Sequence, residues 1–345
     1  MKKMNPLVSV IVVNHNRGDL LRQCLNSILS QSYNRLEIVV VDNGSSDNSL
    51  SVVESFLDPK IKLMTLDQNY GFARGNNVGI QEAQGELIAL LNNDAVADEH
   101  WIERLVEAMQ SGSQVGMCAS KILFFETEVV DKVGHLIYLD GQNRGRGTGV
   151  KDKGQYESVE EVLFPDACAA LYRRRMLEEV GYFDEQFFAY GDDADLGIRS
   201  RWRGWKCLYV PEALAHHHHS STAGRFSPQK VYWVERNRLW LAMKNFPLPL
   251  LVLNPFLTLY RWLWNALAAL LGRGAAGQFR RNESFWVLFL VVAQAYCDGL
   301  VRLGEILRKR RIVRQTRRIS DFEFYRLIFR HRISARTLAF HDTEF

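Results

Sequence analysis

The stretch VSVIVVNHN, Val8 to Asn16, is a run of mostly β-branched apolar residues that ends in three polar ones. A short apolar run of this kind is typical of a strand that is buried on both faces of a parallel sheet. Apolar residues at helical spacing follow between Leu20 and Leu29. We therefore predict a strand, a polar turn and a crossover helix, which is the repeating unit of an α/β fold.

The same order recurs along the N-terminal third of the chain. LEIVVVDNGSSDNS predicts a second strand, Leu36 to Val41, followed by polar residues, and residues 61–66 predict a third. The Gly/Asn-rich turn NYGFARGNN, Asn69 to Asn77, then precedes a helix. This spacing predicts a parallel sheet with right-handed crossovers, so the polar strand ends should gather at one edge. The glycines match neither a GxGxxG nor a GxxxxGK[ST] pattern, which disfavours dinucleotide dehydrogenases and P-loop NTPases.

A further buried strand, Glu86 to Leu91, runs into the polar triplet Asn92-Asn93-Asp94. Open α/β sheets bind ligands at the carboxyl ends of their strands. Asp94 can ligate a hard cation such as Mg²⁺ or Mn²⁺, with substrate phosphates as further ligands. The alternative is an Asx turn that leads into the next helix.

A second acidic site lies in FDEQFFAYGDDADLGIRSRWRGW, Phe183 to Trp205, which places five carboxylates among aromatic residues. Such a cluster is costly unless it binds a cation, pairs with a base or takes part in proton transfer. The alternative is that Asp192 and Asp193 stabilise the N-terminus of the helix that follows.

Six segments resemble, in the same order, the motifs of inverting family 2 glycosyltransferases, in the branch that includes rhamnosyltransferases of bacterial polysaccharide synthesis. They are VSVIVVNHNR, VVVDNGSSDNS, NYGFARGNNVGI, ALLNNDA, GYFDEQFFAYGDDADLGIRSRWRGW and VPEALAHHHHSSTAG, and they cover residues 7 to about 225. The resemblance implies an α/β protein of the GT-A fold, with a Rossmann-like, mostly parallel sheet flanked by helices. It also implies a metal-dependent hexosyltransferase that uses Mg²⁺ or Mn²⁺ and a nucleotide-sugar donor, with dTDP-rhamnose as a candidate.

The resemblance also implies roles for individual residues. Asp42 matches the acid that hydrogen-bonds the nucleobase, and Asp193 matches the catalytic base. Asp94 is the carboxylate that remains of the family's metal-binding DxD motif. The substrate-binding residues implied in this way are Asn14, Asn16, Asp42, Gly71, Arg74, Asn77, Asn93 and Asp192. On the acceptor side, Asp166-Ala167-Cys168 departs from the family's usual Gly-Ala.

Four consecutive histidines, His216 to His219, precede Ser220. The family places one histidine three residues before a serine, which points to His217 as a second metal ligand. In an extended segment His217 and His219 would share a face, because side chains alternate along a strand. A structural or incidental run, or an internal tag, is the alternative.

The implied reaction is a single displacement. A base removes the proton from an acceptor hydroxyl while the oxygen attacks the anomeric carbon opposite the leaving nucleoside diphosphate, which inverts the stereochemistry. A divalent cation offsets the charge that develops on the diphosphate. The expected acceptor is a glycan or a lipid-linked saccharide of cell-surface polysaccharide synthesis.

The chain changes character after a catalytic domain that we place at residues 1–228. Residues 229–345 combine Trp- and Leu-rich helices, interrupted by Pro247, Pro249, Pro255 and Arg261, with a basic tail. Between Arg302 and Arg336, twelve Arg or Lys residues stand against three acidic ones, although the whole chain nets only +4. This predicts an in-plane anchor on an anionic membrane surface, peripheral or monotopic, at the cytoplasmic face of the inner membrane. A packing or dimerisation element, or a spanning helix within 246–271, is the alternative; no segment resembles a nucleic-acid recognition fold.

Two other functions fit parts of the sequence. A non-catalytic membrane-bound scaffold could keep the fold, but Asp94 and Asp193 are both present. A nucleotidyltransferase has a similar sheet and metal, but it would need a basic phosphate loop near the N-terminus, which VNHNRGD does not provide. No signal peptide is expected, because Met1-Lys2-Lys3 is followed by the first strand.

Overall fold

The computed structural model describes residues 5–219, 227–282 and 284–341, which form two compact units. The first unit comprises the described residues up to 134 together with 145–200 and 205–219, and it contains the sheet. The second comprises 135–144, 201–204 and the described residues from 227 onward. Two short internal segments thus join the C-terminal region that the sequence analysis placed at 229–345.

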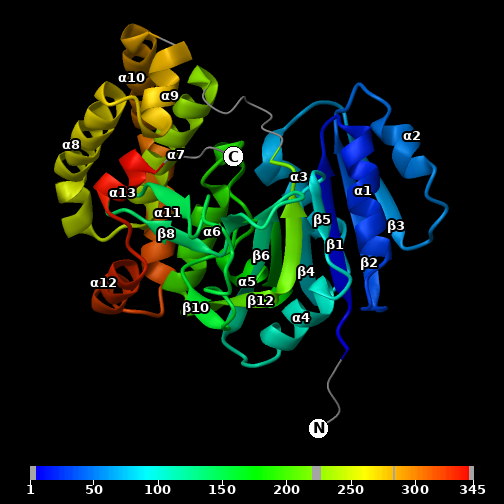
Figure 1. Ribbon diagram of the computed structural model, residues 1–345. Helices are drawn as coiled ribbons and strands as arrows, with labels where there is room; N and C mark the ends of the chain where they lie inside the picture. Colours follow the sequence, from blue (N-terminus) through cyan, green and yellow to red (C-terminus); the bar gives the residue numbers. More distant parts are fainter. Residues whose placement is uncertain (1–4, 220–226, 283, 342–345) are drawn as a thin grey trace. The chain divides into compact units, whose positions relative to one another are not determined.

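The first unit begins with the strand and helix series that the sequence predicts and continues with further strands (Figure 1). Its strands are β1 (Val8–Asn14), β2 (Leu36–Asn43), β3 (Ile61–Leu66), β4 (Leu87–Leu91), β5 (Ala95–Ala97), β6 (Val115–Phe124), β7 (Val130–Lys132), β10 (Glu160–Val162), β11 (Ala169–Arg173) and β12 (Lys206–His217). Its helices are α1 (Gly18–Leu29), α2 (Ser49–Glu54), α3 (Gly71–Glu82), α4 (Trp101–Met109), α5 (Arg174–Val180), the 3₁₀ helix η1 (Glu185–Phe187) and most of α6 (Asp192–Trp202). The expected α/β class is confirmed.

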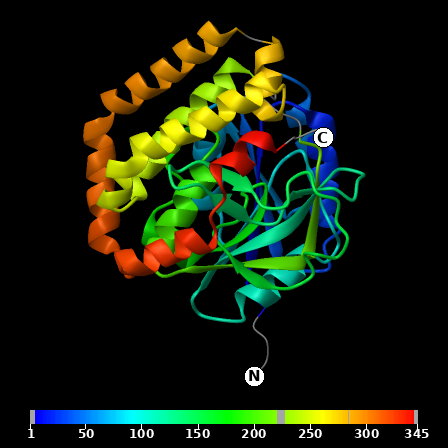
Figure 2. The ribbon, with the colours of Figure 1, turned by 60° about the vertical axis from the view of Figure 1, so that its left-hand side comes forward.

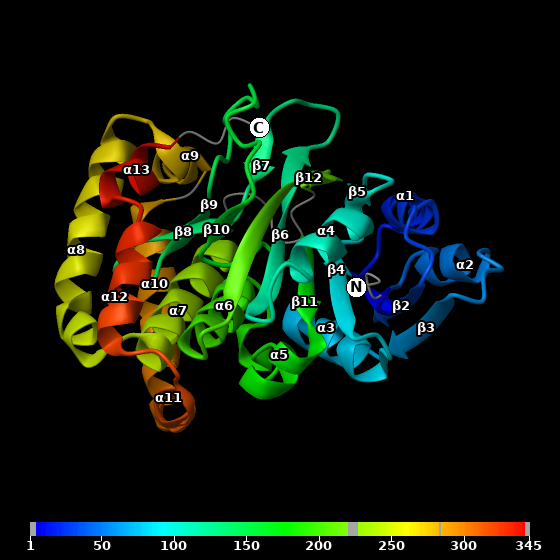
Figure 3. The same cartoon turned by 90° about the horizontal axis from the view of Figure 1, so that it is seen from below.

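One sheet runs through the first unit in the order β10-β12-β6-β11-β4-β1-β2-β3, and Figure 3 shows these strands side by side. The pairs β1–β2, β1–β4 and β2–β3 are parallel, as predicted. Beyond β4 the sheet is mixed, because β11 lies antiparallel between β4 and β6. The description as mostly parallel therefore holds for the part of the sheet formed by β1, β2, β3 and β4, and not for the whole sheet.

Each face of the sheet is covered by helices, so its central strands are buried on both sides. Along β1, Val8, Val10 and Val12 pack with α1 and α4 in one apolar cluster, whereas Ile11 belongs to the cluster on the opposite face with α3. This alternation follows from the two-residue period of a strand. It explains why apolar residues stand at both odd and even positions of the run that begins at Val8.

Most of the second unit is helical, as the yellow to red ribbon in Figure 2 shows. Its short strands β8 (His135–Ile137) and β9 (Asn143–Gly145) pair with each other. Its helices are α7 (Pro228–Asn245), α8 (Leu248–Leu270), α9 (Gly274–Asn282), α10 (Phe285–Val301), α11 (Leu303–Thr316), α12 (Asp321–Arg330) and α13 (Ala335–Phe340). The predicted interruption by prolines is wrong for α8. Pro249 occupies the first turn, where a helix needs no backbone donor, and Pro255 lies inside a continuous helix.

Within the described residues no single helix meets the length and hydropathy expected of a membrane span. The pair Gly274–Arg281 and Trp286–Val301 meets the criteria only jointly, with a bend of 120° between its helices.

Candidate functional site

The carboxyl ends of three parallel strands bring polar side chains together, as the strand pattern predicts. Asn14 ends β1 and is fully buried. Its Nδ2 donates to Oδ1 of Asp42 at 3.2 Å, and its Oδ1 accepts from Nδ2 of Asn93 at 2.7 Å. Asp42 Oδ2 in turn accepts the backbone N–H of Ser45. These bonds fix a carboxylate and two amides at one edge of the sheet.

The loop after β1 holds an unusual backbone. Asn16 and Arg17 both have positive φ, at 61° and 67°, although neither is glycine. The side-chain oxygen of Asn16 accepts the backbone N–H of Ser46, and the backbone N–H of Asn16 donates to Oγ of Ser45. Non-glycine residues in the left-handed region are uncommon and are held there by surrounding contacts. The loop after β2 therefore sets the shape of the loop after β1.

Gly71 starts α3 where the chain passes very close to the segment that precedes α6. Its φ is +84°, and a Cβ atom there would stand 2.5 Å from the carbonyl oxygen of Phe188. That oxygen accepts the N–H of Phe72 at 2.7 Å. Arg74, one turn further on, is exposed and lies over the ring of Tyr70 at 3.8 Å. A glycine is required at Gly71 for both its conformation and its spacing.

The side chain of Asn77 connects two segments of the protein by hydrogen bonds. Its Nδ2 donates to the carbonyl of Phe183 and to Oε1 of Glu185, each at 2.9 Å, and its Oδ1 accepts the N–H of Phe183 at 3.0 Å. The residue thus ties α3 to the chain that leads to the acidic pair. The substrate contact that the resemblance implies for Asn77 stays a prediction.

Asp94, His217 and Asp131 form a buried polar triad. Nε2 of His217 lies 3.2 Å from Oδ1 of Asp94, and Nδ1 lies 2.7 Å from Oδ2 of Asp131. The three side chains come from the end of β4, the end of β12 and β7. Asp94 and His217 adjoin because β12 pairs antiparallel with β5, which places His217 opposite Ala95.

The histidine run presents one buried imidazole. His217 is buried, whereas His216 and His218 are partly exposed, and burial lowers the pKa of both. Burial opposes a charge on His217 as well, but its neighbours, the Cys168 sulfur and the carboxylates of Asp131 and Asp94, outweigh that effect and raise its pKa well above the ordinary value. The His219 ring lies 5.2 Å from that of His217, as expected for residues two apart on an extended segment.

The donor set at Asp94 and His217 fits a divalent cation. Two ligand atoms bound at right angles to one ion, at about 2.1 Å each, lie about 3.0 Å apart. The observed separation is 3.2 Å. A metal-bound histidine ordinarily donates its other ring N–H to a carboxylate, which is the place that Asp131 occupies.

Asp131 and Lys132 were not predicted from the sequence. They extend the network of charged side chains beyond Asp94 and His217. Lys132 Nζ lies 3.9 Å from Asp131 and 2.7 Å from Oδ2 of Asp166. Nearby carboxylates raise the pKa of this lysine well above its usual value although burial opposes the charge. The one signal was Asp166, which stood out as a departure on the acceptor side.

Asp192 and Asp193 open α6 after a turn with left-handed backbone at Phe188, Tyr190 and Gly191. Burial, and next the repulsion from Asp193, raise the pKa of Asp192 well above its ordinary value. Its Oδ2 is buried without a hydrogen-bond partner among the described residues, and the same holds for the hydroxyl of Tyr172. Asp193 is the more exposed of the pair, and its Oδ1 accepts the N–H of Ala194 at 2.7 Å.

The two acidic sites belong to one charged region of the first unit. Burial raises the pKa of Tyr172, and the carboxylates of Asp193, Asp166 and Asp192 raise it further. Asp166 is also the partner of Lys132, which adjoins the triad through Asp131. A linked series of charged side chains therefore runs from Asp94 toward the Asp192-Asp193 pair. Such an arrangement can hold a cation at one end and a proton acceptor at the other.

Comparison with known families agrees with this geometry. Residues 9–181 match the profile described as Glycosyl transferase family 2. The chain belongs to this family. The match includes Asp94 and ends before Asp193 and His217.

Two curated relatives match this chain over part of their own length. The O-antigen biosynthesis protein RfbC of Myxococcus xanthus is 31% identical over 266 residues, which are 74% of this chain and 20% of that protein. Glycosyltransferase GlyG of Streptococcus pneumoniae serotype 4 is 36% identical over 109 residues, 31% of this chain and 36% of that protein. The chain thus matches only a fifth to about a third of the length of these relatives.

Solved structures show the same fold. GalNAc-T7, solved with UDP, GalNAc and Mn²⁺, superposes with a TM-score of 0.57 at 16% identity over 69% of this chain and 48% of that one. A mannosyltransferase of Pyrobaculum calidifontis, solved with GDP-Man and Mn²⁺, gives a TM-score of 0.50 at 17% identity over 86% and 87%. The GT-A architecture expected from the motifs is thereby confirmed.

Proposed function

We propose that this protein is an inverting glycosyltransferase that transfers a sugar from a nucleotide-sugar to a glycan or lipid-linked saccharide. The observation that carries the proposal is the buried pair Asp94–His217, with ligand atoms 3.2 Å apart, beside the strand edge where Asn14, Asp42 and Asn93 meet. A cation site adjoining a polar strand edge is what a nucleoside diphosphate requires. Membership of glycosyl transferase family 2 supports the reaction class.

The two neighbouring carboxyls differ in their surroundings. Burial, and next the repulsion from Asp193, raise the pKa of Asp192, whereas Asp193 is the more exposed of the two. We assign Asp193 as the base that takes the proton of the acceptor hydroxyl, as the family resemblance implies. A positioned carboxylate base contributes about 10²–10⁴-fold. A single displacement with one base and no covalent nucleophile inverts the anomeric centre.

Asp94 and His217 would hold Mg²⁺ or Mn²⁺, which supplies positive charge against the departing diphosphate. Two structural relatives solved with Mn²⁺ support this choice. The chain's own contribution is to orient the ligands: Asp131 accepts from Nδ1 of His217 and so turns Nε2 toward Asp94. The family resemblance assigns the nucleoside to Asn14 and Asp42, which are hydrogen-bonded to each other. It assigns the nucleotide-sugar to the turn that carries Arg74, whose exposed guanidinium lies over the ring of Tyr70.

The donor and the acceptor follow from the relatives and not from the site geometry. Resemblance to the rhamnosyltransferase branch makes dTDP-rhamnose the first donor to test. The O-antigen biosynthesis relative supports an acceptor in cell-surface polysaccharide synthesis. A lipid-linked acceptor would place the reaction at the cytoplasmic face of the membrane.

The decisive experiment is a screen of nucleotide-sugars for release of nucleoside diphosphate, with wild-type protein and Asp193→Asn in parallel. We expect one donor to turn over with Mn²⁺ or Mg²⁺, and the variant to bind that donor but turn it over at least about 10²-fold more slowly. Binding without turnover for every donor and acceptor would favour a scaffold. Release of pyrophosphate from a nucleoside triphosphate would identify a nucleotidyltransferase.

A further inference from the structure

Helix α8 buries its polar side chains and exposes its apolar ones, which is the opposite of what a surface helix of a soluble domain does. Its buried face carries Asn254, Thr258 and Arg261, and Arg261 is the one charged residue in the sequence from 248 to 270. Its exposed face carries large apolar side chains, each at least 41% exposed: Leu248, Val252, Leu253, Phe256, Leu259, Tyr260, Leu263, Leu267 and Leu270. Amphipathic helices of soluble proteins turn their apolar stripe inward and their charges outward.

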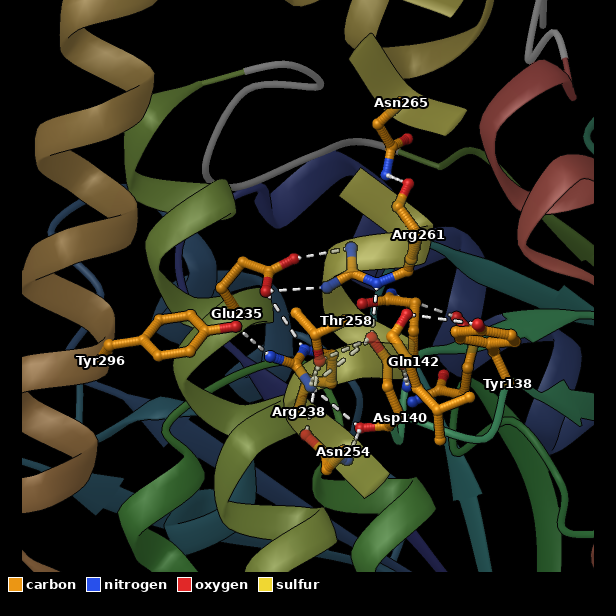
Figure 4. A network of polar contacts seen from close by, with 12 residues as sticks. Tyr138, Asp140, Gln142, Glu235, Arg238, Asn254, Thr258, Arg261, Asn265 and Tyr296 are labelled. Carbon is orange, nitrogen blue, oxygen red and sulfur yellow. Dashed lines mark hydrogen bonds and ion pairs between the residues drawn. The ribbon is translucent and has the colours of Figure 1, made fainter. Parts of the chain in front are cut away.

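A buried network locks α8 in this orientation (Figure 4). Arg261 Nε donates to Oδ2 of Asp140 at 2.6 Å, and its Nη1 lies 2.9 Å from Oε1 of Glu235. Asn254 Nδ2 donates to the carbonyl of Asp140 at 3.0 Å. Arg238 lies between the same two carboxylates. A rotation of α8 about its axis that buried the leucines would leave these charged groups without their partners. The network therefore keeps the apolar face exposed.

Cations border this apolar face at its C-terminal half. Arg280 donates to the carbonyl of Ala269, and Arg281 donates to that of Gly272, both with exposed side chains. The exposed Arg336, from α13, lies over the ring of Trp264 at 5.8 Å. The sequence from 248 to 282 contains no Asp or Glu. Apolar surface edged by unopposed arginines matches an anionic lipid headgroup layer above acyl chains.

We propose that the outer face of α8 lies in the plane of a bilayer surface that contains anionic lipid. With 23 residues the helix is about 34 Å long, so the contact is an extended stripe. Its inner polar face stays in the protein, which an in-plane helix permits. This inference does not rest on the proposed sugar transfer, and its test uses no catalytic readout.

The test measures co-sedimentation of the full chain with phosphatidylcholine vesicles, with and without phosphatidylglycerol. Leu259→Glu combined with Leu263→Glu places charge at the centre of the stripe, and Leu57→Glu is the matched control, since Leu57 is 96% exposed in the first unit. We expect the double variant to lower the vesicle partition coefficient at least about tenfold, because each substitution replaces apolar burial with a charge. The control should leave it unchanged.

A second variant separates the charge contribution. Arg280→Glu with Arg281→Glu should reduce the preference for phosphatidylglycerol, and high salt should weaken wild-type binding in the same way. All variants must first show wild-type thermal unfolding by circular dichroism. Wild-type protein that stays in the supernatant at low salt, or a double variant that sediments like wild type, overturns the proposal. So does a lipid-free dimer in sedimentation velocity that the double variant dissociates, because a second copy would then cover α8.

Discussion

Replacing Asp131 tests whether the triad is a cation site, because Asp131 touches no substrate in the proposed arrangement. Its carboxylate is fully buried and lies 2.7 Å from Nδ1 of His217. The change Asp131→Asn keeps the shape and one acceptor oxygen but removes the charge. The change Asp131→Ala removes the acceptor as well, which leaves the ring free to turn away from Asp94.

The expected loss follows from the outer-shell role of such a carboxylate. Substitutions of residues that orient a metal-bound histidine typically lower metal affinity by 10- to 100-fold, which corresponds to about 1.4–2.7 kcal/mol. Since Asn retains one hydrogen bond, we expect Asp131→Asn to lower the affinity for Mn²⁺ about tenfold. We expect Asp131→Ala to lower it about 100-fold. Lys132 keeps Asp166 at 2.7 Å in both variants, so the rest of the network should survive.

Calorimetric titration with Mn²⁺ measures the effect directly and needs no donor sugar. Asp152→Asn is the matched control, because Asp152 also pairs with a largely buried lysine, Lys121, at 2.8 Å but contacts no histidine of the run. The reasoning is refuted if both Asp131 variants bind Mn²⁺ within twofold of wild type while Asp94→Ala does not. If Asp94→Ala also binds normally, the cation site itself is wrong.

The remaining predictions concern the base, the histidine run and the buried network. Asp193→Asn should lower turnover at least about 10²-fold with donor affinity kept, whereas Asp192→Asn, whose amide mimics a protonated carboxyl, should cost much less; equal losses would contradict the division of roles. His217→Ala should weaken Mn²⁺ binding and His216→Ala should not, as the same calorimetry would show. Arg261→Met should lower the free energy of unfolding by about 3–5 kcal/mol at pH 7, because two buried carboxylates lose a partner. Since those carboxyls have lowered pKa values when folded, their contribution is present above the unfolded pKa of about 4 and is lost as pH falls, so urea unfolding should show a smaller difference between wild type and variant in acid. A destabilisation that is independent of pH would contradict this.

Local patterns predicted the strand edge of the candidate site well. The apolar runs that end at Asn14 and before Asn93 specify where buried strands stop, and parallel strands bring their ends together. The bond of 2.7 Å between those two residues is a direct consequence. The runs could not specify the direction of the strands beyond β4, because a short buried strand such as β11 fits a parallel or an antiparallel position equally well.

Asp131 could not be predicted because its significance depends on residues far away in the chain. It lies 86 positions before His217, in a three-residue strand, Val-Asp-Lys, that matches no motif. Only the pairing of β7 with β6 and of β6 with β12 brings the two side chains together. A motif search finds residues that share a local segment, whereas an outer-shell carboxylate is selected by tertiary structure alone.

The role of Arg261 also depends on residues far away in the chain, and the sequence pattern around it was misleading. In the sequence it reads as a break in an apolar run, and together with Pro255 it suggested interrupted helices. In the structure the arginine is the inner anchor of a continuous helix, and its charge is matched by Asp140 and Glu235. The apolar residues around it are therefore the ones left outside. A charge inside an apolar run can thus mark the buried side of a helix, so that the leucines, and not the arginine, indicate which face meets the surroundings.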